Sequence, residues 1–249
     1  MKKLLIIITS LLLLSTVTNA QLWKLRRYEF SAGVGTTQFY GDIGGYSPDK
    51  NILGLKDFTF KHTRFNINTS LRYRVAEVFS LRVNMVLGAF HSTDIRGANL
   101  FRGFESNTLF IEPSLIGEYY FIKNKSENSF VFLKGSNKLI KSVFESLDFY
   151  VFAGFGGLAY KVNPNTVLAH YVTKTSSFTG VVPVGAGVSM LYNSKIKFGI
   201  EFGGRYIFSD NIDGYTSALS KSNDVYHMVN FTFTYKLNLG NNPVLSLGR

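Results

Sequence analysis

Apolar and polar residues alternate one by one over residues 64–75, which read RFNINTSLRYRV. Successive side chains of a β-strand point to opposite faces, so this pattern predicts a strand with one apolar and one polar face. The apolar face carries Phe65, Ile67, Thr69, Leu71, Tyr73 and Val75. The polar face carries Arg64, Asn66, Asn68, Ser70, Arg72 and Arg74. The two faces are therefore expected to meet different surroundings.

Seven further segments alternate in the same way, at residues 27–35, 79–88, 108–121, 149–160, 182–192, 196–208 and 225–236. In residues 149–160, glycines and aromatic residues leave the phase of the alternation open. At about 3.3 Å per residue and a tilt near 45°, a run of about twelve residues rises roughly 28 Å, close to the thickness of a membrane's hydrocarbon core. The pattern predicts an all-β fold, an eight-stranded antiparallel transmembrane β-barrel of the outer-membrane type.

The connections between these segments differ in length in a regular order. Those after the first, third, fifth and seventh segments are long and polar, at residues 39–63, 91–107, 161–180 and 209–224. Those after the second and sixth are tight. Outer-membrane barrels have short periplasmic turns and longer extracellular loops. We therefore expect both chain termini to lie in the periplasm.

A soluble lipocalin-like barrel would alternate too, with its apolar face inward. Aromatic residues toward the segment ends, as in the girdles of membrane barrels, favour the membrane instead. Arginine facing lipid costs about 2–4 kcal/mol at the midplane, so the polar faces are expected to point into the lumen. The predicted lumen ion network consists of Glu29, Arg64, Arg72, Arg74, Arg82, Glu112, Glu118, Glu201 and Arg205. Because eight strands leave room for little more than side chains, we expect a plug of ion pairs and hydrogen bonds instead of a pore.

The N-terminus of the 249-residue chain has the layout of a secretory signal peptide. Lys2 and Lys3 precede an apolar run over residues 4–14, and small residues follow up to Ala20. The expected division is a signal peptide over residues 1–20 and a barrel domain over residues 21–249. Without the two leader lysines, 25 basic and 16 acidic residues give a formal charge of +9, down from +11. In an exported protein this charge favours anionic lipid, lipopolysaccharide included, over nucleic acid. The chain has no cysteine, and no later run of eighteen apolar residues predicts a spanning helix.

One connection departs from the regular order, on the predicted periplasmic side. It covers residues 123–147 and contains GSNKLIKSVFESL, for which Ser136 is a credible N-cap. Its apolar helical stripe consists of Leu139, Ile140, Val143, Phe144 and Leu147. Two interpretations stay open. The helix covers the barrel mouth or lies on inner-leaflet head groups, or it docks a periplasmic protein.

Four stretches resemble the PorG-like outer-membrane barrels of the Bacteroidota, a family associated with type IX secretion. They read GVGTTQFYGDIG, RGANLFRGFESNTLFIEPSLIGEYYF, FYVFAGFGG and IKFGIEFGGRYIFSDNIDGYT. The last looks like the family's Glu-x-x-x-Arg strand, carried by Glu201 and Arg205, followed by an acidic loop with Asp210 and Asp213. The resemblance covers most of the mature chain. It implies a non-enzymatic role in tethering or assembling periplasmic secretion-ring proteins at the outer membrane.

Candidate chemistry is sparse. Barrel proteases need Asp and His pairs at the rim, where His91, Asp94, Asp210 and Asp213 are expected, and barrel deacylases need a Ser-His pair. His227 is expected to face lipid, with Val229 as its neighbour on that face. The loop carboxylates of Asp42, Asp94, Asp210, Asp213 and Asp224 show no calcium-binding spacing. No catalytic residue, cofactor or metal is predicted.

A third class of function is surface recognition, in which extracellular loops bind host or matrix ligands. It requires exposed loops with apolar tips. The first long loop partly meets this requirement, with Tyr46, Ile52, Leu53, Leu55 and Phe58. A generic structural or adhesion barrel is therefore the alternative to the tethering function.

Overall fold

The computed structural model of the protein describes residues 26–44, 60–95, 99–125, 127–133, 139–172, 174–217 and 223–237. The predicted signal peptide, residues 1–20, lies outside the described residues, as do the five apolar residues of the first long loop named above. Within the described ranges, no helix combines the length and the apolar character that crossing a membrane requires.

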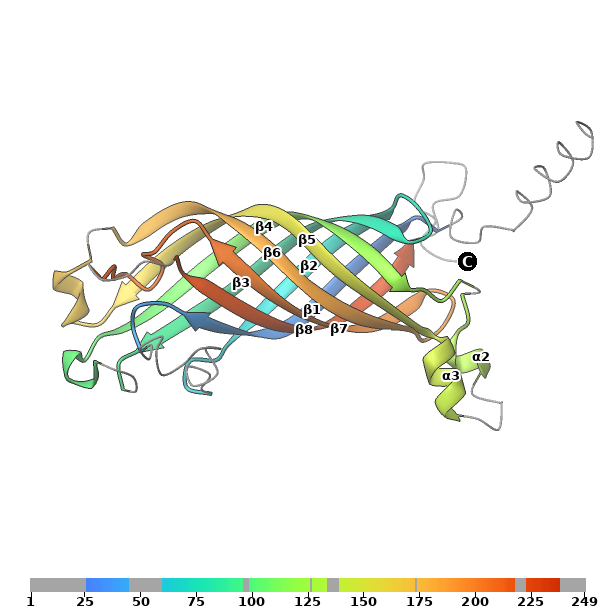
Figure 1. Cartoon of the computed structure of the whole chain (residues 1–249), viewed down its shortest axis with the longest axis horizontal. Coiled ribbons are helices and arrows are strands. Elements are labelled where there is room, and N and C mark those ends of the chain that lie inside the picture. The colour runs from blue at the N-terminus through green and yellow to red at the C-terminus, as the bar shows by residue number, and fades with distance from the viewer. Residues whose placement is uncertain are drawn as a thin grey trace, which may run out of the picture.

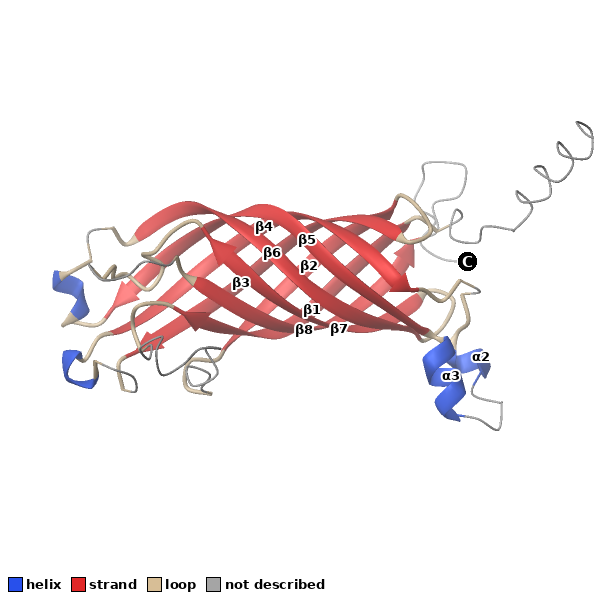
Figure 2. Cartoon of the chain, in the orientation of Figure 1, coloured by secondary structure: helices blue, strands red, loops and turns tan. Residues whose placement is uncertain are grey.

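Eight antiparallel strands pair in chain order, and β1 also pairs with β8, which closes the barrel (Figure 1). The strands are β1 (Tyr28–Tyr40), β2 (Arg64–Arg74), β3 (Phe79–Thr93), β4 (Glu105–Ile122), β5 (Leu147–Pro164), β6 (Ser176–Leu191), β7 (Ile196–Ile207) and β8 (Val225–Leu237). The connections contain the 3-10 helices η3 (Leu100–Arg102) and η4 (Leu168–His170) and the α-helices α2 (Phe130–Leu133) and α3 (Leu139–Glu145) (Figure 2). The predicted fold class is confirmed.

The two ends of the barrel differ. The end that we call the turn end holds the short β2–β3 and β6–β7 turns, the insertion between β4 and β5, and the described chain ends Arg26 and Leu237 (Figure 1). The opposite end, the loop end, holds the four longer connections with η3 and η4. Helices α2 and α3 hang beside the wall at the turn end and do not lie across the mouth (Figure 2).

Exposure alternates over most of each strand and separates an outward from an inward face. In β2, Phe65, Ile67 and Leu71 are exposed, whereas Asn66 and Arg72 are buried in the lumen. The outer surface is apolar and aromatic around the barrel, which would be unfavourable in water but suits hydrocarbon. A closed wall also leaves no unpaired strand edge in lipid. The barrel therefore spans a membrane with its charged faces inward.

Strand lengths agree with this placement. The strands have 11 to 18 residues. At about 3.3 Å per residue and a tilt near 45°, 11 residues rise roughly 26 Å and 18 residues roughly 42 Å. The shorter strands match the hydrocarbon thickness, and the longest ones, β4 and β5, extend beyond it.

Strand β5 shows which face its ambiguous segment turns inward. Tyr150, Phe152 and Tyr160 are buried in the lumen, while Val151 and Phe155 face outward. Glycines on β6 make room for the inward rings. A Cβ atom added at Gly187 would lie 2.4 Å from Cζ of Tyr150, so a larger residue would not fit there.

The insertion between β4 and β5 differs from the predicted single helix. Helix α3 ends at Glu145, and Leu147 is the first residue of β5, paired with Met190 of β6. The expectation that Leu147 belongs to the helical stripe is wrong, because sheet pairing satisfies its backbone instead. The predicted N-cap Ser136 lies outside the described residues, as does the side chain of Leu139.

Candidate functional site

The turn half of the lumen contains a buried network of ion pairs centred on Glu118. Its carboxylate accepts two hydrogen bonds from Arg72, at 2.6 and 2.9 Å, and lies 3.1 Å from Nε of Arg82. Arg82 also pairs with Glu201, and Arg72 pairs with Glu29 at 3.0 Å. All five side chains are buried, so each charge depends on its partners.

Two tyrosines complete this network. Tyr120 donates a hydrogen bond to Glu118 at 2.9 Å, and Tyr150 donates one to Glu201 at 2.7 Å. The guanidinium of Arg82 also lies 5.4 Å from the ring centroid of Phe152. Hydroxyl donors and ring faces thus satisfy the charges on the sides that no ion pair covers.

Lysines and a second set of carboxylates extend the network to the mouth of the turn end. Lys197 lies 3.1 Å from Glu29 and 3.4 Å from Asp148, and Lys123 lies 2.9 Å from Asp148. Arg74 bonds Glu29 at 2.9 Å. Lys197 was not among the predicted members, and neither was Lys236, although both lie on the polar phase of their strands.

Glu127, from the insertion, closes this mouth. Its carboxylate bonds Arg74 at 3.3 Å and Lys236 at 3.0 Å, and its backbone has a φ of 49°, in the left-handed region. Burial alone would raise the pKa of Glu127, but Lys236 and Arg74 lower it below its usual value. Burial, helped by Lys197, lowers the pKa of Lys123 to about 7. Glu127 had no signal in the sequence, because it lies outside every alternating segment.

The remaining residues of the predicted ion network lie elsewhere. Glu112 and Arg205 are buried nearer the loop end, with Nε of Arg205 3.8 Å from Oε1 of Glu112, and Tyr226 donates a hydrogen bond to Glu112. Arg64 is not part of the network. Its guanidinium donates to the carbonyls of Lys61 and Thr63, just before β2, and Arg64 is only partly buried.

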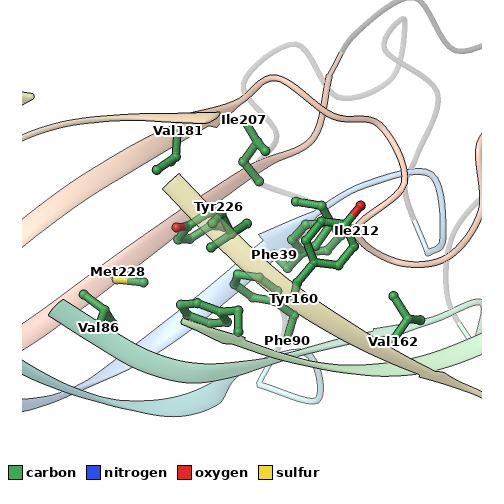
Figure 3. Close-up of a cluster of buried hydrophobic side chains, with 12 residues drawn as sticks. Phe39, Val86, Phe90, Tyr160, Val162, Val181, Ile207, Ile212, Tyr226 and Met228 are labelled. Carbon is green, nitrogen blue, oxygen red and sulfur yellow. The ribbon is translucent and has the colours of Figure 1, made fainter. Parts of the chain in front are cut away.

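The loop half of the lumen is filled by apolar side chains, which the predicted plug of ion pairs did not include. The ring of Phe90 stacks on Phe110 with centroids 4.2 Å apart and lies 4.8 Å from that of Tyr226. The cluster consists of Phe39, Val86, Phe90, Phe110, Leu158, Tyr160, Val162, Val181, Ile207, Ile212, Tyr226 and Met228 (Figure 3). Every member is buried, so this half of the lumen is also closed.

Above this cluster the connections of the loop end form an ordered cap. Asp94 accepts hydrogen bonds from Arg102, at 2.7 and 2.9 Å, and from the amides of Gly44 and Phe104. A small apolar cluster joins all four connections and consists of Ile43, Phe104, Leu168, Val172 and Tyr215. The cap therefore holds its described loops in one arrangement.

Two buried carboxyl groups lie together at the base of the cap. Asp213 accepts hydrogen bonds from the amides of Ile43 and Tyr215, and Asp224 accepts one from Ile212, each at 3.0 Å. A Cβ atom added at Gly41 would lie 2.8 Å from Oδ2 of Asp213 and from Oδ1 of Asp224. The absence of a side chain at Gly41 therefore leaves room for both carboxyl groups. Burial raises the pKa of Asp213 to about 7, and burial and Asp213 raise that of Asp224.

The histidines considered for catalysis are separated. His91 bonds Asn107 at 2.9 Å at the loop end, and its Nε2 lies 3.8 Å from Glu105. His227 is on the outer face, where its ring stacks on Phe202 at 5.8 Å and its cross-strand partners are Gln38 and Gly204. Over the described ranges, acidic and histidine side chains form no group of three arranged to hold a metal ion.

No family model matches the sequence, and no curated protein does. Similar solved structures include Neisserial surface protein A, 13% identical over 84% of this chain and 96% of that one, with a TM-score of 0.45. Outer membrane protein W of E. coli is 14% identical over 85% and 97%, with a TM-score of 0.42. The outer membrane enzyme PagL is 13% identical over 84% and 99%, with a TM-score of 0.34.

The class of this protein follows from its own wall and lumen. Eight antiparallel strands close without an edge, the outside is apolar, and the inside holds paired charges and packed rings. This is the architecture of the small β-barrels of bacterial outer membranes. The chain is a small outer-membrane β-barrel.

Proposed function

We propose that the protein is a sealed, non-enzymatic barrel that acts through the surfaces at its two ends. The observation that carries this proposal is the filled lumen. Ion pairs around Glu118 occupy the turn half, and the rings around Phe90 occupy the loop half. Because both fillings are buried and mutually packed, a solute has no open path through them.

Planar-bilayer recording tests the sealed lumen. Purified protein inserted at increasing amounts is expected to give no steady conductance, while an open porin in the same bilayers gives regular steps. The porin controls for insertion and salt. Steady, reproducible steps from the purified barrel would contradict the proposal.

The direction of the barrel in the membrane is part of the proposal. Short turns on the periplasmic side and long loops outside would place the cap on the cell surface and both termini in the periplasm. Because the chain has no cysteine, a single introduced one reports its own position. A membrane-impermeant maleimide should label Phe101→Cys on intact cells and Ile140→Cys only after the outer membrane is opened. The reverse result would invert the assignment.

Surface recognition is the function that the loop end favours. Helix η3 of the cap presents Leu100 and a fully exposed Phe101, and the αL residue Gly103 ends the helix. An exposed aromatic side chain on an ordered support is a typical binding anchor. Cells that carry the barrel are expected to adhere to immobilised collagen, laminin or fibronectin, and Leu100→Ser with Phe101→Ser should abolish the adhesion. Equal adhesion of cells without the barrel would contradict this function.

Tethering of periplasmic secretion-ring proteins is the second candidate, and helix α3 favours it. Ile140 is 74% exposed and Phe144 is 65% exposed, one helical turn apart on the same face. The helix hangs beside the wall at the turn end, where a periplasmic partner could reach it (Figure 1). An unpartnered apolar pair of this kind suits a protein interface.

Crosslinking in cells separates the two candidates. Mild crosslinking and purification of the barrel should recover periplasmic ring components if the helix tethers them, and Ile140→Asp with Phe144→Asp should lose them. Lys141→Gln, on the same helix and 67% exposed at its side chain, is the matched control. Recovery that does not depend on the apolar pair would remove the helix as the docking element.

The non-enzymatic part of the proposal has its own test. Expression in a host with known lipid A should leave the lipid A mass spectrum unchanged. A shift in mass that disappears with His91→Ala or His227→Ala would show an enzyme.

A further inference from the structure

The outer wall of the barrel carries an apolar groove that the proposed function does not use. Its volume is about 810 Å³, and it crosses the wall from the start of β5 over β6, β7, β8 and β1 to β2. Its large apolar side chains, such as Val34, Ile67 and Phe198, belong to the outward face of these strands. Gly33, Asn68, Gly199 and Thr232, of the inward phase, alternate with them along the wall. The groove therefore opens to the membrane and not to the lumen.

Strand register shows how the groove is built. One wall is a single row of paired residues, Leu147, Met190, Phe198, Phe233, Ala32 and Thr69. The other wall is the adjacent outward row, which runs from Val188 on β6 to Ile67 on β2. Phenylalanine rings stand along the middle of the rows. The small Ala32 then leaves the far part of the groove open, between Phe233 on one side and Thr69 on the other.

The groove climbs from the turn end into the membrane. Leu147 is the first residue of β5, whereas Thr69 lies in the middle of β2. Five strand spacings of about 4.8 Å make the row roughly 24 Å long. One lipid tail spans half of a hydrocarbon core of ~30 Å, or about 15 Å. The row is long enough for one tail that enters at the membrane boundary and ends near the midplane.

Basic side chains lie at the boundary where the groove begins. Lys195 belongs to the β6–β7 turn, and Arg26 donates a hydrogen bond to the carbonyl of Ser194 in the same turn. The turn directly follows the groove residue Met190, and Tyr192 lies between them with its ring 5.7 Å from that of Phe198. Two cations beside an interfacial tyrosine are suited to a lipid phosphate.

We propose that this groove binds one acyl chain of an anionic phospholipid from the leaflet at the turn end. The tail lies between the two outward rows, and the phosphate lies at Arg26 and Lys195. The apolar walls give retention, and the two cations give the preference for an anionic head group.

Native mass spectrometry of the intact barrel tests the site. The protein is reconstituted in bilayers of phosphatidylglycerol and phosphatidylethanolamine, extracted into detergent and weighed with its retained lipid. The wild type is expected to keep one phosphatidylglycerol. Ala32→Phe fills the far part of the groove, so the tail loses its close contacts there and retention is expected to fall about tenfold.

Matched variants control for folding and for charge. Ala153→Phe adds the same ring to the outer face of β5, away from the groove, and should leave retention unchanged. Circular dichroism checks that both phenylalanine variants are folded. Arg26→Gln with Lys195→Gln should keep a bound lipid but lose the preference for phosphatidylglycerol.

Three outcomes would overturn the proposal. Equal retention by Ala32→Phe and the wild type would show that the groove holds no specific tail. A protein dimer that Ala32→Phe abolishes would make the groove a contact between two copies of the chain. If barrel extracted directly from cells retained only lipopolysaccharide, the bound acyl chain would come from the opposite leaflet.

Discussion

The two halves of the lumen are filled by opposite chemistry. The turn half holds paired charges, with Arg72 and Arg82 around Glu118. The loop half holds stacked rings, with Phe90 between Phe110 and Tyr226. A charge network fails when one charge loses its partner, whereas an apolar cluster fails in proportion to the volume removed. The comparison shows two different ways to close the same narrow space.

The change from one filling to the other can be followed along single strands on different sides of the barrel. On β3 it falls between Asn84 and Val86, and on β8 between Asn230 and Met228. The Glu112 carboxylate lies at this level and accepts a hydrogen bond from Tyr226, a member of the apolar cluster. The halves are therefore in contact. Substitutions in each half separate their contributions to the stability of the barrel.

The largest expected effect comes from Glu118→Gln. The change leaves Arg72 and Arg82 buried with one shared carboxylate fewer, and breaking a buried pair in this way costs about 3–5 kcal/mol. The free energy of unfolding in lipid vesicles, measured by urea titration, should fall by that amount. Glu145→Gln on exposed α3 is the control and should change little. A loss below about 1 kcal/mol for Glu118→Gln would show that the network is not needed for stability.

Phe90→Ala is expected to cost about 3 kcal/mol, the lower end for removing a buried ring, because Phe110 and Tyr226 lie close enough to fill part of the space. The same urea titration measures it. Phe155→Ala, on the outer face of β5, should cost much less because lipid replaces the lost contacts. Equal losses at the two positions would contradict a packed loop half.

The cap above the rings is expected to loosen as pH rises. Asp213 keeps its proton in the closed cap, because burial raises its pKa to about 7 and Asp42, Asp210 and Asp224 face it. A raised pKa stabilises the closed form at low pH. That stability is lost between about pH 4 and pH 7, by up to about tenfold in the opening equilibrium per pH unit.

Hydrogen exchange of the Ile43 and Tyr215 amides, corrected for intrinsic rates, measures this opening. Asp213→Asn keeps an acceptor for these amides and cannot ionise, so its protection should not vary with pH. Protection of the wild type that is constant from pH 5 to pH 8 would contradict the raised pKa of Asp213.

The mouth of the turn end is expected to respond in the opposite direction, with the smallest effect. Lys236 and Arg74 lower the pKa of Glu127 below its usual value, against the effect of burial. At pH values above the usual glutamate pKa, these ion pairs therefore stabilise the insertion. This stabilisation is lost as the pH falls below that pKa. Glu127→Gln should cost about 1 kcal/mol of local stability. Exchange of the Val131 amide, which donates to the carbonyl of Tyr192, measures it. Unchanged protection in Glu127→Gln would show that the ion pairs of Glu127 do not stabilise the insertion.

The barrel could be predicted from the sequence because lipid imposes a strict pattern on each strand. Every outward position between Phe65 and Tyr73 meets hydrocarbon or the girdle, so alternation alone separates the faces. The order of long and short connections then gives the pairing of neighbours. Arg72, Arg82 and Glu118 could be placed in the lumen for the same reason.

The apolar filling of the loop half could not be predicted in that way. Phe90 and Phe110 point inward, yet Ala89, Leu109 and Ile111 beside them are apolar too, so the alternation of the sequence weakens there. Contacts between strands determine which aromatic rings point into the lumen and pack against one another. Arg64 shows the same limit, because its position on the polar phase does not reveal that its guanidinium bonds the nearby carbonyls of Lys61 and Thr63 instead of a carboxylate.

Leu147 shows how a local pattern can fit two structures. Its spacing from Val143 and Phe144 suits a helix, and its identity suits the first residue of a strand. The pairing with Met190, more than forty residues away in the chain, decides between them. Sequence spacing carries no information on that distant partner.

The charges at the seam between β1 and β8 match in only one register of the two strands. Glu29 stands opposite Lys236 on one side and opposite Arg72 on the other. If the last strand docked two residues out of place, Glu29 would face Thr234 or a residue past the strand, and an unmatched lysine would be trapped inside the wall. Closure of the barrel should therefore favour the register that keeps Lys236 opposite Glu29 and within reach of Glu127.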